Sequence, residues 1–151
     1  MHNPGDFYRV SVAAAKLLQR RAILIGTKAA PEGDSQNVLA LPYAAYSQVF
    51  RHAAVNVHQG GSGTTGEALR AGRPMLVVPY GWDQPDNASR VQRLGVGLHV
   101  ARNAYTLETA TSALTKLLQT AQFSNHAAEI RTQLAAENGL AAACTAIEYL
   151  L

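Results

Sequence analysis

Short aliphatic runs alternate with longer segments of helical periodicity along most of this chain. The aliphatic runs are four to six residues long, and most end at glycine, proline or a polar residue, as expected for strands buried on both faces. The segments between them repeat apolar side chains every three or four residues, which predicts amphipathic helices. We predict strands at 22–25, 38–41, 54–57, 74–79 and 97–101. We predict helices at 4–20, 44–51, 64–71, 87–94, 107–118, 124–137 and 140–150.

Strands that alternate with helices are typical of an open parallel α/β sheet with helices on both faces. In such a sheet the ligand lies at the carboxyl ends of the strands. The segments 58–63 and 80–85 both follow strands, so we expect these two loops to lie at one edge and to form one site. Residues 28–37 read as an exposed loop, and the chain has no internal repeat. We expect one domain over residues 1–151.

Helix ends and helix faces give further predictions. Asn3, Asp86 and Thr106 are expected to be N-caps of the helices that follow them. The lone Cys144 lies in an apolar run and is expected to be a buried structural thiol. The helix side chains expected to face the core are Phe7, Val10, Ala14, Leu17, Leu18, Leu107, Leu114, Leu117 and Leu118.

Composition narrows the class of protein. The chain has 151 residues, of which 48% are hydrophobic and 15% charged, which suits one compact folded domain. Its net charge is +3, but the 13 lysines and arginines are scattered, so no nucleic-acid partner is expected. A single cysteine excludes an internal disulfide and fits a reducing compartment. With no membrane-length apolar run and no signal-peptide pattern, we expect a cytoplasmic protein.

The turn between residues 57 and 64 carries the first candidate chemistry. Gly60, Gly61, Gly63 and Gly66 fall within seven residues, at the junction of a predicted strand and helix. A tight turn that binds nothing is the simpler interpretation, but each glycine costs up to ~1 kcal/mol of backbone entropy relative to alanine. The first N–H groups of a helix lack intrahelical partners and carry the positive end of the helix dipole. We therefore predict an anion site, most often one for phosphate.

The segments HQGGSGTTGEALRAGRPMLVVP and DQPDNA together resemble the donor-binding signature of family 1 nucleotide-sugar glycosyltransferases, which have the GT-B fold. The likeness is strongest to bacterial enzymes that glycosylate lipids and natural products, including rhamnosyltransferase-like members, and it covers residues 44–97. The resemblance implies a Rossmann-like domain that forms the C-terminal, donor-binding half of such an enzyme. The implied function is hexose transfer from a UDP- or dTDP-sugar to a hydroxyl of a small-molecule or lipid acceptor.

The resemblance also implies roles for individual residues near the turn. Glu67 matches a carboxylate that accepts hydrogen bonds from both ribose hydroxyls, although it could also be a favourable charge in the first helical turn. The residues that the resemblance implies bind the diphosphate are Gln59, Gly60, Gly61, Ser62, Gly63 and Thr64. His58 is a further candidate, because the family usually has histidine directly before the first loop glycine, where this chain has Gln59.

Other implied contacts lie on flanking loops. Asp83 and Gln84 match a pair that holds hydroxyls of the transferred sugar, although Asp83 by itself reads as a turn or cap residue. Trp82 could cover that sugar or be an exposed loop aromatic. Tyr43 and Ala44 lie in the segment implied to hold the base, with Tyr43 and Tyr46 as candidate stacking surfaces or simply rim aromatics.

The implied mechanism is an inverting displacement at the anomeric carbon through an oxocarbenium-like transition state, with no metal and no cofactor beyond the sugar donor. The family places the acceptor and the catalytic base on a separate N-terminal domain, for which this chain has no room. This chain also begins at a predicted helix, whereas the family's C-terminal half begins with a strand. We expect a fragment, a truncated reading frame or a subunit of a split enzyme, without a catalytic residue of its own and inactive alone.

Two alternatives stay open. Residues 61–66 match G-x-G-x-x-G, the fingerprint of NAD(P)-dependent oxidoreductases, although no acidic residue ends the next strand. The chain could also be a non-catalytic nucleotide-sugar-binding subunit that needs a separate acceptor subunit. In that case an apolar surface should be exposed where the partner sits.

Overall fold

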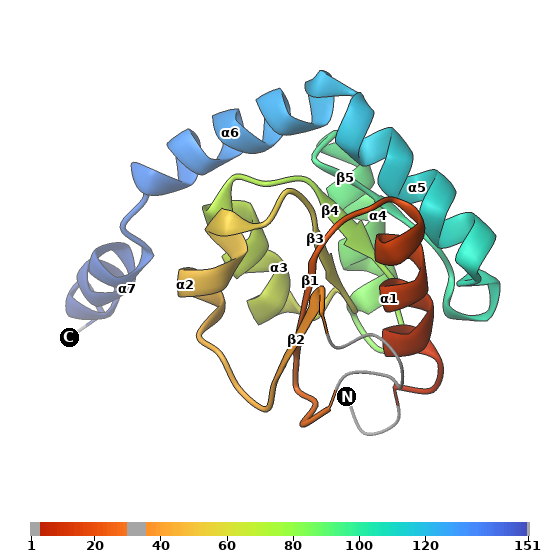
Figure 1. Cartoon of the computed structure of the whole chain (residues 1–151). Coiled ribbons are helices and arrows are strands. Elements are labelled where there is room, and N and C mark those ends of the chain that lie inside the picture. Colours follow the sequence, from red (N-terminus) through yellow and green to blue (C-terminus); the bar gives the residue numbers. More distant parts are fainter. Residues whose placement is uncertain (1–3, 30–35, 151) are drawn as a thin grey trace.

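The structure is a computed structural model that describes residues 4–29 and 36–150, and it confirms an α/β fold with parallel strands between two layers of helices (Figure 1). The strands are β1 (Ala22–Ile25), β2 (Val38–Leu41), β3 (Asn56–His58), β4 (Met75–Val77) and β5 (Gly97–His99). The α-helices are α1 (Phe7–Leu17), α2 (Tyr46–Val49), α3 (Ser62–Ala71), α4 (Gln84–Arg93), α5 (Leu107–Gln119), α6 (Ala121–Ala135) and α7 (Gly139–Glu148). Two 3-10 turns, Phe50–His52 and Arg102–Ala104, complete the described elements.

The strands form two parallel groups. β1 pairs with β2 along its whole length, with Ala22 opposite Val38 and Ile25 opposite Leu41. β4 lies between β3 and β5, with Met75 opposite both Asn56 and Gly97. Parallel strands need crossover connections, and α3 and α4 supply them between β3, β4 and β5. Within each group the carboxyl ends of the strands therefore point the same way.

Central strand β4 shows why both faces of the sheet are covered. Its side chains alternate between two apolar clusters, as the period of two in a strand requires. Leu76 and Val78 pack with residues of α1 and α5 on one face. Met75 and Val77 pack with residues of α3, α4 and α6 on the other face. All four side chains are fully buried, which is why this run is continuously aliphatic in the sequence.

Several predictions of burial were wrong. Leu17 and Leu107 are 64% and 43% exposed, because each lies at the end of its helix, beyond the helix's buried positions. Cys144 is exposed, since none of the residues of α7 is buried against another element of the described chain. Within residues 4–29 and 36–150, no helix is long and apolar enough to cross a membrane.

Some helix starts agree with the sequence predictions and others do not. Thr106 caps α5 as expected, in a reciprocal pair of side-chain hydrogen bonds with Thr109. α4 begins at Gln84 instead of Asn87, so Asp83 is the N-cap residue and Asp86 lies in the first turn. Pro85 explains the shift, because proline is well tolerated in the first turn of a helix. Asn3 and most of the loop 28–37 fall outside the described residues; the cap of α1 is Asp6.

Candidate functional site

The glycine turn lies between the end of β3 and the start of α3, at the carboxyl edge of the sheet. Gly60 has a φ of +89°, and a Cβ at that position would lie 2.6 Å from Cγ1 of Val77 and 3.3 Å from the carbonyl oxygen of Gln84. A left-handed backbone in so confined a place admits only glycine. Gly60 is therefore explained by the fold alone.

Gly63 is different. It is the second residue of α3, it has ordinary helical geometry, and a Cβ built on it meets no heavy atom within 4 Å. Nothing in the fold requires glycine there, and glycine costs the helix up to ~1 kcal/mol relative to alanine. The space above the first turn of α3 is open, and Ser62 and Gly63 are exposed. The helix starts at Ser62, two residues before the predicted Thr64, so its free N–H groups lie closer to the glycine turn than the sequence indicated.

His58 lies beneath the turn and not in it. Its side chain is buried, and Nδ1 accepts a hydrogen bond from the Gly60 N–H at 3.0 Å. Burial lowers the pKa of His58 to about 4, so the imidazole is neutral at physiological pH. Nε2 is buried and has no hydrogen-bond partner. Gln59 is half-buried, and its Nε2 lies 3.5 Å from where a Cβ of Gly61 would be, which places the amide beside the turn.

The second loop is organised by Gln84. Its side chain is buried, and Oε1 accepts hydrogen bonds from the backbone N–H groups of Tyr80 at 2.8 Å and Gly81 at 3.3 Å. One end of the Gln84 amide thus holds the loop itself. Trp82, between these residues, is 89% exposed and has a φ of +55°, a conformation that costs a bulky residue ~1–3 kcal/mol. The buried glutamine therefore helps to hold an exposed tryptophan in a strained backbone.

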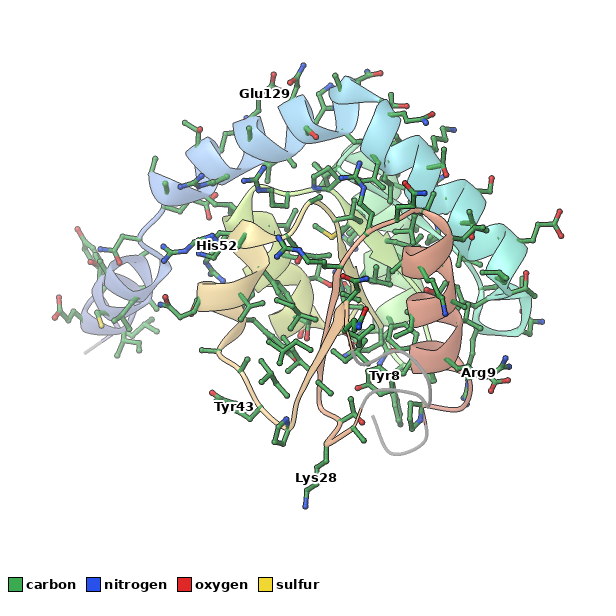
Figure 2. The ribbon with its side chains drawn as sticks, viewed as in Figure 1. Tyr8, Arg9, Lys28, Tyr43, His52 and Glu129 are labelled. Carbon is green, nitrogen blue, oxygen red and sulfur yellow. The ribbon has the colours of Figure 1, made fainter. Side chains whose placement is uncertain are left out.

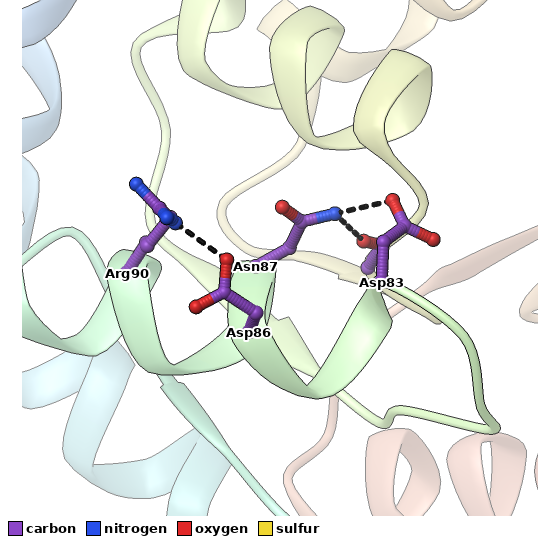
Figure 3. A network of polar contacts seen from close by, with 5 residues as sticks. Asp83, Asp86, Asn87 and Arg90 are labelled. Atoms are coloured by element: carbon purple, nitrogen blue, oxygen red, sulfur yellow. Dashed lines mark hydrogen bonds and ion pairs between the residues drawn. The ribbon is translucent and has the colours of Figure 1, made fainter.

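Asn87 connects the two loops, and sequence reasoning missed it. Its Nδ2 group donates to the carbonyl oxygen of Gly60 and to Oδ2 of Asp83, each at 2.8 Å (Figure 3). An amide nitrogen has two hydrogens, so both bonds can form at once. The available signal was the spacing of Asp83 and Asn87, because residues i and i+4 share one face of a helix. The expectation that the glycine turn and the loop 80–85 lie together is confirmed.

Glu67 follows the turn in the sequence, and the segment implied to bind the base, Tyr43 and Ala44, precedes it. Glu67 is the sixth residue of α3, so it is not a first-turn charge; its half-buried carboxylate pairs with Arg70 at 3.3 Å. Tyr43 is 81% exposed at the rim of the molecule (Figure 2). Tyr46 stacks on Phe50 with ring centroids 4.6 Å apart, which occupies one of its faces. α2, which follows Tyr43 and Ala44, packs against α3 and joins this segment to the site.

The site offers hydrogen-bond donors and little charge. Backbone N–H groups at the start of α3, the hydroxyls of Ser62 and Thr64 and the amide of Gln59 can all donate to an anion. The acceptors are the carboxylates of Asp83 and Glu67, which suit hydroxyl groups. Among the described residues, no three His, Cys, Asp or Glu side chains gather as they would around a metal ion. The arrangement is suited to a ligand that carries both phosphate and hydroxyl groups.

Comparison with known proteins identifies the family. Residues 28–147 match the family described as erythromycin biosynthesis protein CIII-like, C-terminal domain. This chain belongs to that family, a group of glycosyltransferase C-terminal domains. The O-mycaminosyltylonolide 6-deoxyallosyltransferase of Streptomyces fradiae is 35% identical over 98% of this chain. The chain spans about a third of that relative, 35% of its length.

Solved structures of glycosyltransferases have the same fold. The kitacinnamycin glycotransferase aligns with 99% of this chain and 40% of its own, with a TM-score of 0.87 and 28% identity. The spinosyn rhamnosyltransferase SpnG complexed with thymidine diphosphate aligns with 97% of this chain and 41% of its own, with a TM-score of 0.82 and 24% identity. The predicted membership of the GT-B glycosyltransferases is confirmed.

Proposed function

We propose that this chain is the donor-binding half of an inverting glycosyltransferase, which transfers a hexose from a dTDP- or UDP-sugar to a hydroxyl acceptor. The observation that carries the proposal is the open first turn of α3 at Gly63. A helix start with free N–H groups and no side chain in front of it is a site for a phosphate group. The relatives, all glycosyltransferases, favour a nucleotide sugar over the dinucleotide of an oxidoreductase.

Most of the candidate residues have a role in this proposal. Gln59, Ser62, Gly63 and Thr64 hold the diphosphate, and the positive end of α3 stabilises the charge that grows on it as the nucleoside diphosphate leaves. One well-placed donor of this kind is worth ~3 kcal/mol in the transition state. Glu67 accepts hydrogen bonds from the ribose hydroxyls, for which it has to leave Arg70 or share its second oxygen.

The sugar and the base bind on either side of the diphosphate. The Asp83 carboxylate oxygen that is not bonded to Asn87 accepts hydrogen bonds from sugar hydroxyls. Gln84 donates to the sugar through Nε2, because its Oε1 already accepts hydrogen bonds from the loop backbone. Tyr43 and Ala44 contact the base. Thymine is the base we favour, since one structural neighbour is a complex with thymidine diphosphate. Acceptor binding and the catalytic base belong to an N-terminal half, and without it we expect no transfer.

The test is a calorimetric titration of the purified chain with dTDP, UDP and NADH in parallel. We expect saturable binding of dTDP or UDP that weakens at least ~10-fold in Gly63→Val, because valine fills the space in front of the helix start. Valine is no worse than glycine inside a helix, so this variant should keep its stability.

Gly139→Val is the matched control, since Gly139 also opens a helix with nothing within 4 Å of its Cβ position but lies far from the turn in the chain. Binding of NADH with no response to either nucleoside diphosphate would overturn the proposal in favour of an oxidoreductase.

A further inference from the structure

The loop that carries Trp82, Asp83 and Gln84 is closed by hydrogen bonds of its own. Besides the two bonds that Oε1 of Gln84 accepts, the backbone N–H of Gln84 donates to the Gly81 carbonyl oxygen at 3.2 Å. These bonds join the two ends of the segment 80–84 and give it a defined shape. They do not fix where the segment lies relative to the rest of the protein, which depends on contacts outside it.

Open space lies on one side of this loop. A cavity of about 320 Å³ is lined by Gly81 and Pro85 from the loop side, and by His99 and Ala101 at the end of β5 and just after it. Close packing therefore does not hold the loop against β5. Trp82, in the middle of the loop, is almost fully exposed and adds little packing. The position of the loop must be set by a few specific contacts.

Tyr80 supplies such contacts at the start of the loop. Its hydroxyl donates to the Pro4 carbonyl oxygen at 2.8 Å. The guanidinium carbon of Arg102 lies 4.2 Å from the centre of its ring, which is a cation–π arrangement. Phe7 packs against the same ring in a T-shaped pair, with centroids 6.4 Å apart and 71° between the planes. Contacts from α1, from the residue Pro4 before it and from the 3-10 turn after β5 thus hold one half-buried side chain.

The partners of Tyr80 belong to the rigid part of the fold. The Pro4 carbonyl oxygen also accepts the Phe7 N–H at 3.1 Å, which makes it part of the turn that opens α1. Phe7 is buried and stacks on Tyr105 with ring centroids 5.6 Å apart, in the cluster between α1, α5 and β4. The loop is therefore attached through Tyr80 to the apolar core.

The backbone of Trp82 shows why the attachment matters. Its positive φ is a strained conformation for a bulky residue, and such a conformation persists only where the surrounding structure enforces it. Gln84 and Tyr80 enforce it together, because the Gln84 side chain closes the loop and the Tyr80 side chain attaches the closed loop to α1. Without this attachment the strain can relax by a movement of the loop into the cavity. Asp83, which follows Trp82 directly, would move with it.

We propose that Tyr80 is a positioning residue: its hydroxyl bond to Pro4 and its ring contact with Arg102 fix the Asp83 carboxylate relative to the glycine turn. The protein thereby binds a nucleotide that carries a sugar in preference to the bare nucleoside diphosphate. Tyr80 has this effect without touching the ligand. The inference rests on the proposed function, which assigns Asp83 to the sugar. It adds a second anchor to Asn87, which holds the loop from the side of the glycine turn.

The first test compares Tyr80→Phe with Tyr105→Phe in calorimetric titrations of the full chain with dTDP and dTDP-glucose. Tyr80→Phe removes only the hydroxyl and its bond to Pro4. We expect it to weaken binding of dTDP-glucose by ~3–10-fold, which corresponds to one hydrogen bond, and binding of dTDP by less than ~2-fold. Tyr105→Phe is the matched control, because it also removes one hydroxyl contact in the same cluster, the 3.0 Å contact with Ser11 of α1. It should leave the ratio of the two affinities unchanged.

Amide hydrogen exchange of the ligand-free chain, measured by NMR, gives a second readout that does not depend on the proposed function. The N–H of residue 80, bonded to Gln84, should exchange at least ~5-fold faster in Tyr80→Phe, because a loop released from α1 opens more often. The N–H of Met75, bonded to the Val96 carbonyl oxygen at 3.1 Å within the sheet, reports opening of the whole fold and should not change.

The outcomes separate the two proposals. Unchanged exchange at residue 80 in Tyr80→Phe, or an equal increase at residue 80 and Met75, overturns the positioning role. An equal loss of affinity for dTDP and dTDP-glucose overturns it as well. If the parent chain binds neither ligand while residue 80 responds as expected, the proposed function fails and the anchoring of the loop by Tyr80 stands.

Discussion

Nδ1 of His58 accepts a hydrogen bond from the Gly60 N–H, and Nε2 is buried without a hydrogen-bond partner. A proton added to this ring takes away the acceptor that the turn uses and places a charge in the core. The structure therefore tolerates only the neutral form, which is the reason that burial lowers the pKa to about 4 from 6.5.

Stability should consequently fall as the pH is lowered. The unfolded chain takes up a proton at His58 below about pH 6.5 and the folded chain only near pH 4, so stability rises with pH between these values. The stabilisation from this residue is complete above pH 6.5 and is lost as the pH falls to 4, a total of about 3 kcal/mol. Urea unfolding at pH 7.5, 6 and 4.5 measures it.

Two variants separate this effect from general acid destabilisation. His58→Gln has no titrating ring and should show a shallower dependence on pH, whatever its stability at pH 7.5. His99→Gln, which removes an exposed histidine, is the control for the loss of an imidazole. Equal slopes in the parent and His58→Gln would show that this histidine is not the source.

At the scale of single residues, the sequence predicted the glycine turn but not the different parts that its residues play in the fold. Four closely spaced glycines predicted the turn, yet only the folded structure distinguishes Gly60, which the backbone requires, from Gly63, which it does not. Gln84 was chosen for its likeness to a sugar-binding pair. Its engagement with the Tyr80 and Gly81 N–H groups depends on a loop conformation that no local pattern encodes.

One side chain of α4 is hydrogen-bonded to the turn that precedes α3. Asn87 of α4 donates to the turn that precedes α3 and to the residue that caps its own helix. The glycine turn and the Asp83 carboxylate are thereby fixed relative to each other. A ligand that contacts both the glycine turn and the Asp83 carboxylate binds more tightly when their relative position is fixed before it binds.

We expect Asn87→Ala to weaken dTDP binding several-fold and to lower the free energy of unfolding by about 1–2 kcal/mol, the value of one to two hydrogen bonds. Calorimetry and urea unfolding measure the two effects. Asp86→Ala is the matched control on the same helix, because the pair of Asp86 with Arg90 at 2.7 Å is solvent-exposed (Figure 3). It should cost no more than about 0.5 kcal/mol and leave binding unchanged. Equal effects of the two substitutions would contradict a linking role for Asn87.

Elements were predictable where burial alone defines them. The strands 22–25 and 38–41 agree with the structure at both ends, because aliphatic runs bounded by polar residues leave little freedom. α6 starts at Ala121, three residues before the predicted Ser124, since Thr120 serves as the cap residue of α6 and ends α5 as well. Such a shared junction is set by how two helices meet, which the separate periodicities do not show.

The molecule as a whole leaves its last helix uncovered. α7 is rich in alanine, and all of its residues are exposed. Leu140 and Ile147 of this helix, and Tyr149 just after it, are among the large apolar side chains at the surface. α6, by contrast, buries Ala127 against α3 and β4. The two consecutive helices thus differ in what they contribute to the fold.

Removing residues 139–151 should change the free energy of unfolding by less than about 0.5 kcal/mol, because almost no buried surface is lost. It should also reduce self-association at high concentration, since an exposed apolar patch is removed. Thermal unfolding and light scattering test both expectations. Truncation after Gln119 removes α6 as well and should destabilise the chain strongly; a comparable loss from removing α7 alone would contradict this description.

The division of the strands into two groups, β1 with β2 and β3 with β4 and β5, was not predicted from the sequence. Strands 22–25 and 54–57 are each well formed locally, and nothing in either run indicates which strand lies beside it. Pairing between strands far apart in the chain is a property of the assembled fold. Sequence predicted the layers and the edge where ligands bind, and the structure added the order of strands across that edge.

The strained loop at Trp82 has a practical consequence. This indole is the single tryptophan of the chain, and it stands almost fully in solvent on the loop between β4 and α4. Its fluorescence therefore originates at one known place. A sugar or nucleotide that covers the ring changes the polarity around it and with it the colour and yield of the emitted light. The protein carries an intrinsic optical probe at the proposed donor site, and occupancy can be followed in solution without an attached dye.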